Sequence, residues 1–333
     1  MKKHLKIVLI STISVVGLIG CFALGVFLNG TCFDKFDEKG AVYKDWMKDI
    51  SDEKKLEDIV IPGSHDSGTY GMNWLGCTQS YSIKEQLYTG SRYLDLRINK
   101  KSQDEFVMYH GILNGTTLAA NMKDIKDFIK DYPTETLLLD FQHFKGDAQE
   151  DVKDYLDLNF NKENLLVTNT TELNDLEYVS SLKMKDVRGK CLVFFGDNSS
   201  LSLNDFIFAR NNDGCTNKGQ SLNSCYISSY NRSSSEDYIK TGLPYYFENI
   251  KNKIAEEKFK GIFVLQGQLT DGKVIFGPFS REKSHDSNMS EYINNLPSSD
   301  DFSLVNVIMR DFVTPTKNKQ IIDLNTDKGN FNK

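Results

Sequence analysis

The 333-residue sequence predicts an α/β fold, an irregular TIM-type (β/α)8 barrel that forms a single catalytic domain after an N-terminal hydrophobic segment. Apolar runs of strand length recur along the chain, and polar segments with helical periodicity separate several of them. Strands that are apolar throughout are typical of a parallel sheet buried on both faces. Eight of them in about 280 residues fit a barrel, which is irregular because some connections are too short for a helix. Periodicity leaves a doubly wound open sheet as the structural alternative.

The first 30 residues differ in composition from the rest of the chain. Three lysines within the first six residues precede the apolar run Ile7–Leu28, which matches the roughly 20 residues of a membrane-spanning helix. A cleaved signal peptide usually has a shorter apolar part, so we expect a retained anchor with a cytoplasmic N-terminus. The stretch ending at Cys21 also resembles a lipoprotein cleavage box. We therefore expect a signal or anchor segment over 1–30, and a domain over 31–333 that is exported, either membrane-anchored and facing outside or secreted.

Two hydrophobic patterns predict the strands and helices of the rest of the chain. Apolar runs predict strands at Leu56–Ile61, Arg92–Ile98, Glu105–Tyr109, Thr136–Phe141, Cys191–Phe195, Ser224–Ser229, Gly261–Gln266 and Leu304–Arg310. Apolar residues at three- and four-residue steps predict helices at Leu118–Lys130, Asp147–Asn159, Tyr245–Lys258 and Ser287–Leu296. No repeat or linker rich in proline and glycine divides this sequence region, so we expect one domain.

Charge and cysteine content exclude some classes of function. The formal net charge of −6 argues against a nucleic-acid partner, which a basic face would attract. An anionic ligand would have to be held by a few well-placed cations. The six cysteines form no CxxC or Cys/His ligand spacing, so we expect no structural zinc. Cys215 and Cys225 could close a small disulfide loop in an exported chain, whereas Cys191 lies in an apolar run and is expected to be a buried free thiol.

Ionisable residues lie within or directly after five candidate strands. They are His65 and Asp66 after the first, Asp95 and Arg97 within the second, His110 after the third, Asp140 and His143 after the fourth, and Asp311 after the last. Residues two apart in a strand share one side, so Asp95 and Arg97 face the same way. Active sites assemble at the carboxyl ends of barrel strands. The pattern therefore predicts one site, although each residue alone is also compatible with a structural ion pair or a loop histidine.

These residue types suit phosphoryl transfer without a metal. Two histidines can act as general base and general acid in one turnover. An arginine offers a planar fork to phosphate oxygens, and carboxylates can orient the imidazoles. A hard metal ion would need several converging carboxylates, and Arg97 stands where a second one would help. We therefore expect neither a metal nor a cofactor.

The same residues resemble the catalytic X domain of the phosphatidylinositol-specific phospholipase C family, especially its bacterial and X-domain-only members. The resemblance runs from about Asp45 to Phe312. Its matching stretches are Ile61 to Gly68 (IPGSHDSG), Arg92 to Arg97 (RYLDLR), Tyr109 to Gly111 (YHG), Asp186 to Lys190 (DVRGK) and Val307 to Asp311 (VIMRD).

The resemblance implies a role for each residue. His65 matches the general base that takes the proton from the inositol 2-hydroxyl, and His110 matches the general acid that protonates the diacylglycerol oxygen. Arg97 stands where metal-independent members have arginine and calcium-dependent members have an acidic ligand. Asp66 and Asp311 look like the carboxylates that orient and charge-balance the histidines.

The remaining positions concern substrate binding. Asp95 looks like a polar partner of Arg97. Bacterial members have a substrate-binding lysine near the end of the fourth strand, where this chain has Asp140 and His143. An inositol-binding arginine after the fifth strand is absent from the matching stretch. Asp237 and Tyr238 are the candidates for the later aspartate and tyrosine that contact inositol.

The implied activity is cleavage of phosphatidylinositol or glycosyl-phosphatidylinositol at a membrane surface, which yields diacylglycerol and inositol 1,2-cyclic phosphate. No obligatory protein partner is expected. Two alternatives stay open: a calcium-dependent phosphodiesterase on the same barrel, and a barrel that binds inositol phospholipid without catalysis.

Overall fold

The structure is a computed structural model that describes residues 36, 38–196, 205–210, 225–229, 238–258, 260–269 and 277–332. The expected anchor over 1–30, as well as Cys21, Cys215 and Asp237, lies outside these residues. Within the described ranges, no helix has the length and apolar character needed to cross a bilayer. Cys191 is a buried free thiol, as predicted.

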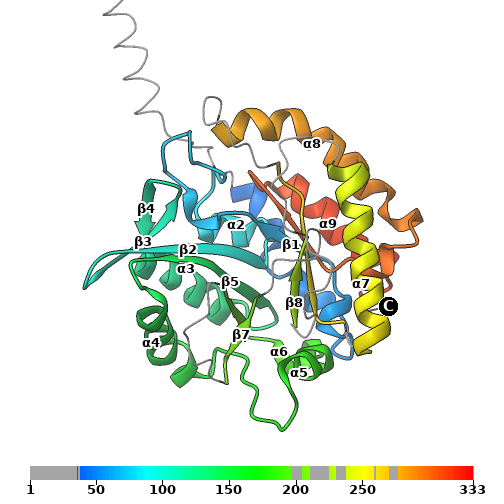
Figure 1. Cartoon of the computed structure of the whole chain (residues 1–333), viewed down its shortest axis with the longest axis horizontal. Coiled ribbons are helices and arrows are strands. Elements are labelled where there is room, and N and C mark those ends of the chain that lie inside the picture. Colours follow the sequence, from blue (N-terminus) through cyan, green and yellow to red (C-terminus); the bar gives the residue numbers. More distant parts are fainter. Residues whose placement is uncertain are drawn as a thin grey trace, which may run out of the picture.

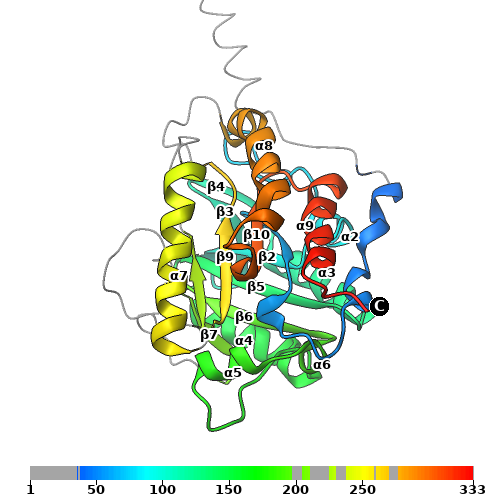
Figure 2. The same ribbon diagram turned by 90° about the vertical axis from the view of Figure 1, so that its right-hand side faces the viewer.

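Parallel strands form a nearly closed barrel, eight of them in the part of the chain that the structure describes (Figure 1, Figure 2). Their order is β7-β6-β5-β2-β1-β10-β9-β8. The bounds are Ile61–Ser64 (β1), Tyr93–Ser102 (β2), Thr136–Lys145 (β5), Lys190–Phe195 (β6), Ile207–Ala209 (β7), Tyr226–Ser228 (β8), Ile262–Gln266 (β9) and Val307–Arg310 (β10). The first and last strands, β1 and β10, pair with each other in parallel. The barrel prediction is therefore confirmed, and the open-sheet alternative is wrong.

One predicted strand lies outside the barrel. The candidate Glu105–Tyr109 corresponds to β3 (Glu105–His110), which pairs antiparallel with β2 and with β4 (Leu113–Thr117). β2 is ten residues long, and its later residues pair with β5 on one side and with β3 on the other, where Ile98 lies opposite Met108. The neighbour of β2 in the barrel is β5 instead, and β7, a three-residue strand next to β6 that we did not predict, brings the number of described barrel strands to eight.

Two other predicted strands begin later than expected. Leu56–Asp58 is a single turn of 3-10 helix, and the first three residues of the candidate Leu304–Arg310 precede β10. The buried Asn306 side chain accounts for the first of these differences. Its amide nitrogen donates to the carbonyl oxygens of Leu56 at 3.1 Å and Ile59 at 2.7 Å, so these backbone groups are satisfied outside the strand ladder.

Helices surround the barrel, with α3 and α4 on one side and α7, α8 and α9 on the other (Figure 1). The four predicted helices are α3 (Leu118–Asp131), α4 (Gln149–Asn159), α7 (Leu243–Glu257) and α8 (Gly277–Asn295). The described chain also contains α2 (Ile83–Tyr88), α5 (Asp175–Ser181), α6 (Met184–Val187) and α9 (Pro315–Asp327). Short apolar patterns made these unpredicted helices hard to find, although capping residues begin several of them; Ser82 and Glu85 form a capping box at α2.

The alternation of side chains along β2 determines which residues reach the barrel interior. Leu94, Leu96 and Ile98 pack outward in the apolar cluster that includes the buried face of α3, whereas Tyr93 packs inward. Asp95 and Arg97 share the phase of Tyr93, because successive strand residues point to opposite faces. The outward leucines thus fix the direction of the two charged side chains.

Candidate active site

His65 and Asp311 come together because their strands are neighbours. Each residue directly follows its strand, β1 or β10, and Ser64 lies opposite Arg310 in the ladder. The His65 backbone N–H donates to the carbonyl oxygen of Arg310 at 3.1 Å, and His65 Nδ1 lies 2.7 Å from Asp311 Oδ1. A carboxylate at Nδ1 favours a proton there, so Nε2 is directed into the site.

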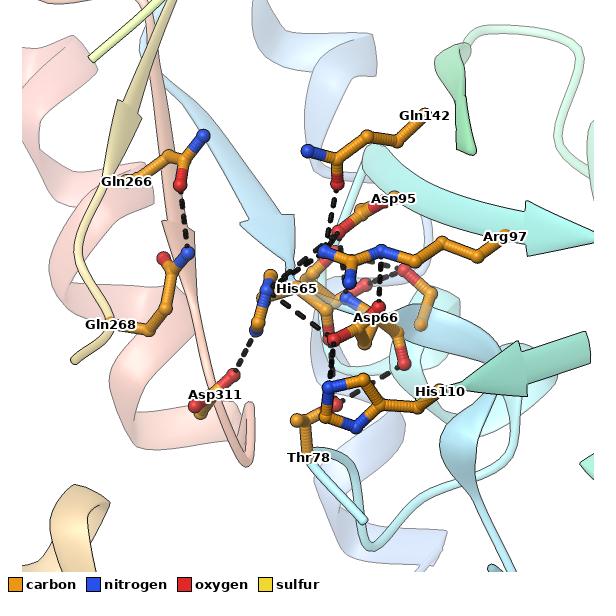
Figure 3. Close-up of polar contacts among 12 residues, drawn as sticks. His65, Asp66, Thr78, Asp95, Arg97, His110, Gln142, Gln266, Gln268 and Asp311 are labelled. Atoms are coloured by element: carbon orange, nitrogen blue, oxygen red, sulfur yellow. Dashed lines mark hydrogen bonds and ion pairs between the residues drawn. The ribbon is translucent and has the colours of Figure 1, made fainter. Parts of the chain in front are cut away.

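The Arg97 guanidinium lies among polar groups from three strand ends (Figure 3). Its Nε is 2.5 Å from Asp66 Oδ1, and its Nη2 is 3.1 Å from Asp95 Oδ2. The same Nη2 donates to Gln142 Oε1 at 2.8 Å and lies 3.1 Å from His65 Nε2. This last contact is a hydrogen bond only when His65 is neutral, since arginine has donors alone.

The charges of this cluster shift one another's pKa values. Burial raises the pKa of Asp66, but Arg97 and the neighbouring histidines lower it more, so the carboxyl stays ionised. Burial lowers the pKa of His65, whereas Asp66 and Asp311 raise it to about 9 despite the opposing charge of Arg97. The neighbouring carboxylates therefore favour a protonated His65 at neutral pH.

His110 reaches the site from the β3–β4 hairpin. Its Nδ1 lies 2.7 Å from the carbonyl oxygen of Gly76, which fixes the proton on that nitrogen. Its Nε2 is 3.5 Å from Asp66 Oδ2, and His65 Nε2 is 3.4 Å from the same oxygen. The two imidazoles thus face one carboxylate oxygen from different elements.

The backbone of Asp66 adopts a conformation that few non-glycine residues have. Its φ of 44° lies in the left-handed region, which costs on the order of 1 kcal/mol or more. Two hydrogen bonds stabilise it: the Asp66 N–H donates to Asp95 Oδ2 at 3.0 Å, and Thr69 Oγ1 donates to the Asp66 carbonyl oxygen at 2.9 Å. The shared carboxylate is held rigidly.

Three residues offer ligand atoms for a cation, but Arg97 is already paired with two of them. His65, Asp66 and Asp95 each offer a ligand atom, and these atoms lie within 4.8 Å of one another. The guanidinium forms ion pairs with both carboxylates, so a divalent cation placed there would meet a fixed like charge in a buried environment. These residues do not fit a calcium ion while Arg97 holds this position.

Asp140, predicted as a substrate-binding residue, lies deep in the barrel. Its Oδ2 accepts hydrogen bonds from the hydroxyl groups of Tyr93 and Tyr226, and from Arg210 Nε at 2.7 Å. Burial raises the pKa of Asp140, which Arg210 partly offsets. Arg210 follows β7, and its guanidinium lies 5.2 Å from the centre of the Tyr226 ring. Arg210 was not predicted, because the strand that it follows has only three residues.

The other two predicted binding residues that the structure describes differ in position. His143 lies opposite Arg97 in the β2–β5 ladder, next to an irregularity in the register, so it is close to the cluster. Tyr238 packs in the apolar cluster that includes the buried face of α7, and its hydroxyl donates to Ser229 Oγ at 2.5 Å. The structure thus brings His143, but not Tyr238, beside the charged residues. Gln142 was not predicted, although it is two residues after Asp140 and shares its inward phase.

The fold and the strand-end cluster define a class, the α/β barrels with an active-site arrangement of two histidines and an arginine. Residues 53–195 match the family model described as phosphatidylinositol-specific phospholipase C, X domain. Residues 53–195 are therefore similar to the X domain of this family, in agreement with the resemblance seen in the sequence.

Curated relatives agree with this similarity, and a solved structure shares the fold. The chain is similar to a 1-phosphatidylinositol phosphodiesterase of Listeria monocytogenes (29% identity over 195 residues, 53% of this chain and 58% of the relative). It is also similar to the human PI-PLC X domain-containing protein 2 (29% over 134 residues, 30% of this chain and 43% of the relative). The chain spans about half the length of the curated relatives it matches. Among solved structures, the phosphatidylinositol-specific phospholipase C from Listeria monocytogenes shares the fold, with a TM-score of 0.62 at 21% identity over 85% of this chain and 98% of that one.

Proposed function

We propose that this chain is a metal-independent phosphodiesterase that cleaves phosphatidylinositol, free or glycosylated, to diacylglycerol and inositol 1,2-cyclic phosphate. The observation that carries the proposal is the placement of His65 and His110, whose Nε2 atoms face one oxygen of Asp66 with Arg97 alongside. The relatives named 1-phosphatidylinositol phosphodiesterase support this choice of substrate.

In the proposed reaction, neutral His65 takes the proton of the inositol 2-hydroxyl on Nε2. The hydroxyl oxygen forms a bond to phosphorus while the bond from phosphorus to the glycerol oxygen breaks. His110 starts as the imidazolium and gives its Nε2 proton to the departing oxygen, so the products are a cyclic phosphodiester and an alcohol. Water then exchanges the protons, which returns both histidines to their starting forms.

Arg97 and Asp311 support this proton transfer in different ways. The guanidinium is fixed by Asp66 and Asp95, so its donors are already oriented toward the charge that develops on the phosphate oxygens. Asp311 accepts from His65 Nδ1 and stabilises the imidazolium that forms.

A lipid surface as partner is supported by the hairpin that carries His110. The leaving diacylglycerol stays in the membrane, so the side of the site near His110 must face lipid. Ile112, two residues further on at the hairpin turn, is 95% exposed. Lys145 donates to the carbonyl oxygen of the adjacent Gly111 and lies 4.3 Å from the centre of the Tyr109 ring. An exposed apolar side chain beside a cation suits an anionic membrane surface.

The headgroup contacts proposed here differ from the bacterial pattern. Gln142 and His143 occupy the part of β5 where that pattern has lysine. Asp140 holds Arg210, whose Nη1 is buried and makes no hydrogen bond to the described residues. The chain has no arginine directly after β6 for the headgroup-binding role, so we assign this role to Arg210, which follows β7.

The composition of residues 1–30 supports a site of action outside the cell, with the domain anchored or secreted. Protease treatment of intact cells should digest the domain if it is anchored outside. Full protection of cell-associated protein, with none in the medium, would contradict this placement.

Phosphorus NMR tests the reaction itself. Purified protein incubated with phosphatidylinositol in mixed micelles and excess EDTA should produce the signal of a cyclic phosphodiester, whereas His65→Ala should not. A requirement for added Ca²⁺ would show the metal-dependent alternative to be right, and tight lipid binding without any product would favour the non-catalytic one.

A further inference from the structure

Gln79 is a fully buried glutamine at the barrel rim, and its side-chain amide bonds three backbone groups in two loops. Its Nε2 donates to the carbonyl oxygens of His65 at 2.9 Å and Arg310 at 3.1 Å. Its Oε1 accepts from the Val313 N–H at 3.0 Å. Because Asp311 lies between Arg310 and Val313, one amide group fixes the chain on both sides of Asp311 and also at His65.

The preceding residue, Thr78, makes the same connection a second time. Its hydroxyl donates to the His65 carbonyl oxygen at 3.1 Å, and its own carbonyl oxygen accepts from the Phe312 N–H at 2.7 Å. Phe312 has a φ of 45° and Asp66 one of 44°, both in the left-handed region. Strained residues of this kind persist only where their surroundings hold them. Thr78 and Gln79 supply hydrogen bonds of this kind. They bond His65, which precedes Asp66, and Thr78 also bonds the strained Phe312 itself.

We propose that Gln79 is a positioning residue: it keeps the His65 imidazole and the Asp311 carboxylate in contact by fixing the two loops that carry them. This inference rests on the proposed function, in which His65 is the base. Gln79 acts through the backbone and does not touch substrate. A shift of about 1 Å between reacting groups can cost roughly 10²-fold in rate, so loss of this amide should be seen in kcat more than in KM.

The test replaces Gln79 with methionine, which has similar length and no hydrogen-bonding amide. We expect kcat to fall at least about tenfold with KM little changed. By NMR titration, the pKa of His65 should fall from its raised value because the contact with Asp311 loosens. Gln86 supplies a matched control: it is equally buried, and its Nε2 donates to the carbonyl oxygens of Ser67 and Tyr81, neither of which carries the pair. Gln86→Met should lower stability and leave the pKa of His65 unchanged.

A double-mutant cycle with Asp311→Asn separates positioning from general stability. If Gln79 acts through Asp311, Gln79→Met should cost much less activity in the Asp311→Asn background than in the wild type. Equal losses in both backgrounds, or an unchanged His65 pKa in folded Gln79→Met, would overturn the inference. If the methionine variant does not fold, Gln79→Glu replaces it in the test, because glutamate keeps an acceptor for the Val313 N–H. If neither variant folds, Gln79 is a determinant of folding and the inference is wrong. The titration needs no substrate, so it tests the positioning role even if the proposed reaction is incorrect.

Discussion

The two histidines of the site occupy regions of very different construction. His65 follows a barrel strand, its side chain is 12% exposed, Asp311 holds its Nδ1, and Thr78 and Gln79 hold its backbone. His110 ends a strand of the appended hairpin, and its side chain is 27% exposed. Its Nδ1 bonds a loop carbonyl oxygen rather than a carboxylate.

This difference matches the two proposed tasks. A base that abstracts a proton from a weakly acidic hydroxyl needs a fixed orientation and a partner for the charge it acquires. An acid that serves a lipid leaving group must lie where the lipid remains, at the edge of the site. The barrel supplies the first requirement and the hairpin supplies the second.

Removal of either imidazole should have the largest effect. His65→Ala and His110→Ala should each lower kcat about 10²–10⁴-fold, the range for lost proton transfer. His143→Ala, a change of the same size beside the cluster, should lower it much less. Initial rates on micellar phosphatidylinositol measure all three. A loss for His143→Ala as large as the other two would mean that the acid–base pair is assigned wrongly.

Arg97 is paired with Asp66, the carboxylate that both histidines face, and its replacement should rank next. Arg97→Lys keeps the charge but cannot bond Asp66, Asp95 and a phosphate through a planar fork. We expect kcat to fall roughly 10²-fold, similar to the loss of one preorganised donor. Near-wild-type activity of Arg97→Lys would show that charge alone is needed. Addition of Ca²⁺ to Arg97→Asp then reveals whether the freed site can take a metal.

The pH dependence should report the region of His65. A general base must be neutral, and the pKa of His65 is raised to about 9. On a substrate with a phenol-type leaving group, which does not need the proton of His110, kcat/KM should therefore rise with pH through neutrality and level off near pH 9. Asp311→Asn removes a charge that raises this pKa, so its profile should level off at lower pH. Rates from pH 5 to 10 on a soluble substrate measure both. A wild-type profile that levels off near pH 6.5 would contradict the electrostatic account.

A change in the hairpin should have the smallest effect on activity. This effect should appear only when the substrate is in a membrane surface. Ile112→Ser should lower activity on vesicles several-fold, because partial burial of this side chain in the membrane contributes only a fraction of the about 1.5–3 kcal/mol available from full burial. Hydrolysis of a short-chain monomeric substrate should not change. Leu158 is a matched control, since it is 61% exposed on α4 and distant in sequence from the site. Equal effects of Ile112→Ser and Leu158→Ser on vesicles would remove the hairpin from the membrane contact.

Local sequence patterns predicted the parts of the site that depend on strand periodicity and strand ends. Asp95 and Arg97 share a face because they are two apart in β2, and His65 and Asp311 follow strands that had to be neighbours in a barrel. The hairpin was misplaced because an apolar antiparallel strand has the same local pattern as a barrel strand.

Long-range contacts explain what the sequence could not predict. Arg210 follows a strand of only three residues, too short to produce a periodic signal. Gln79 depends on the carbonyl oxygen of Arg310, 231 residues away in the chain. Nothing near Gln79 in the sequence indicates that partner, since it is chosen by tertiary packing alone.

The most direct test of the central claim, that His65 is the base and His110 the acid, compares two substrates with the two alanine variants. One substrate keeps the natural glycerol leaving group, and the other has a phenol-type leaving group that departs without a proton. The account predicts that the second substrate restores His110→Ala by at least about tenfold more than His65→Ala, because only the acid becomes dispensable. Equal restoration of both variants, or preferential restoration of His65→Ala, would contradict the assignment.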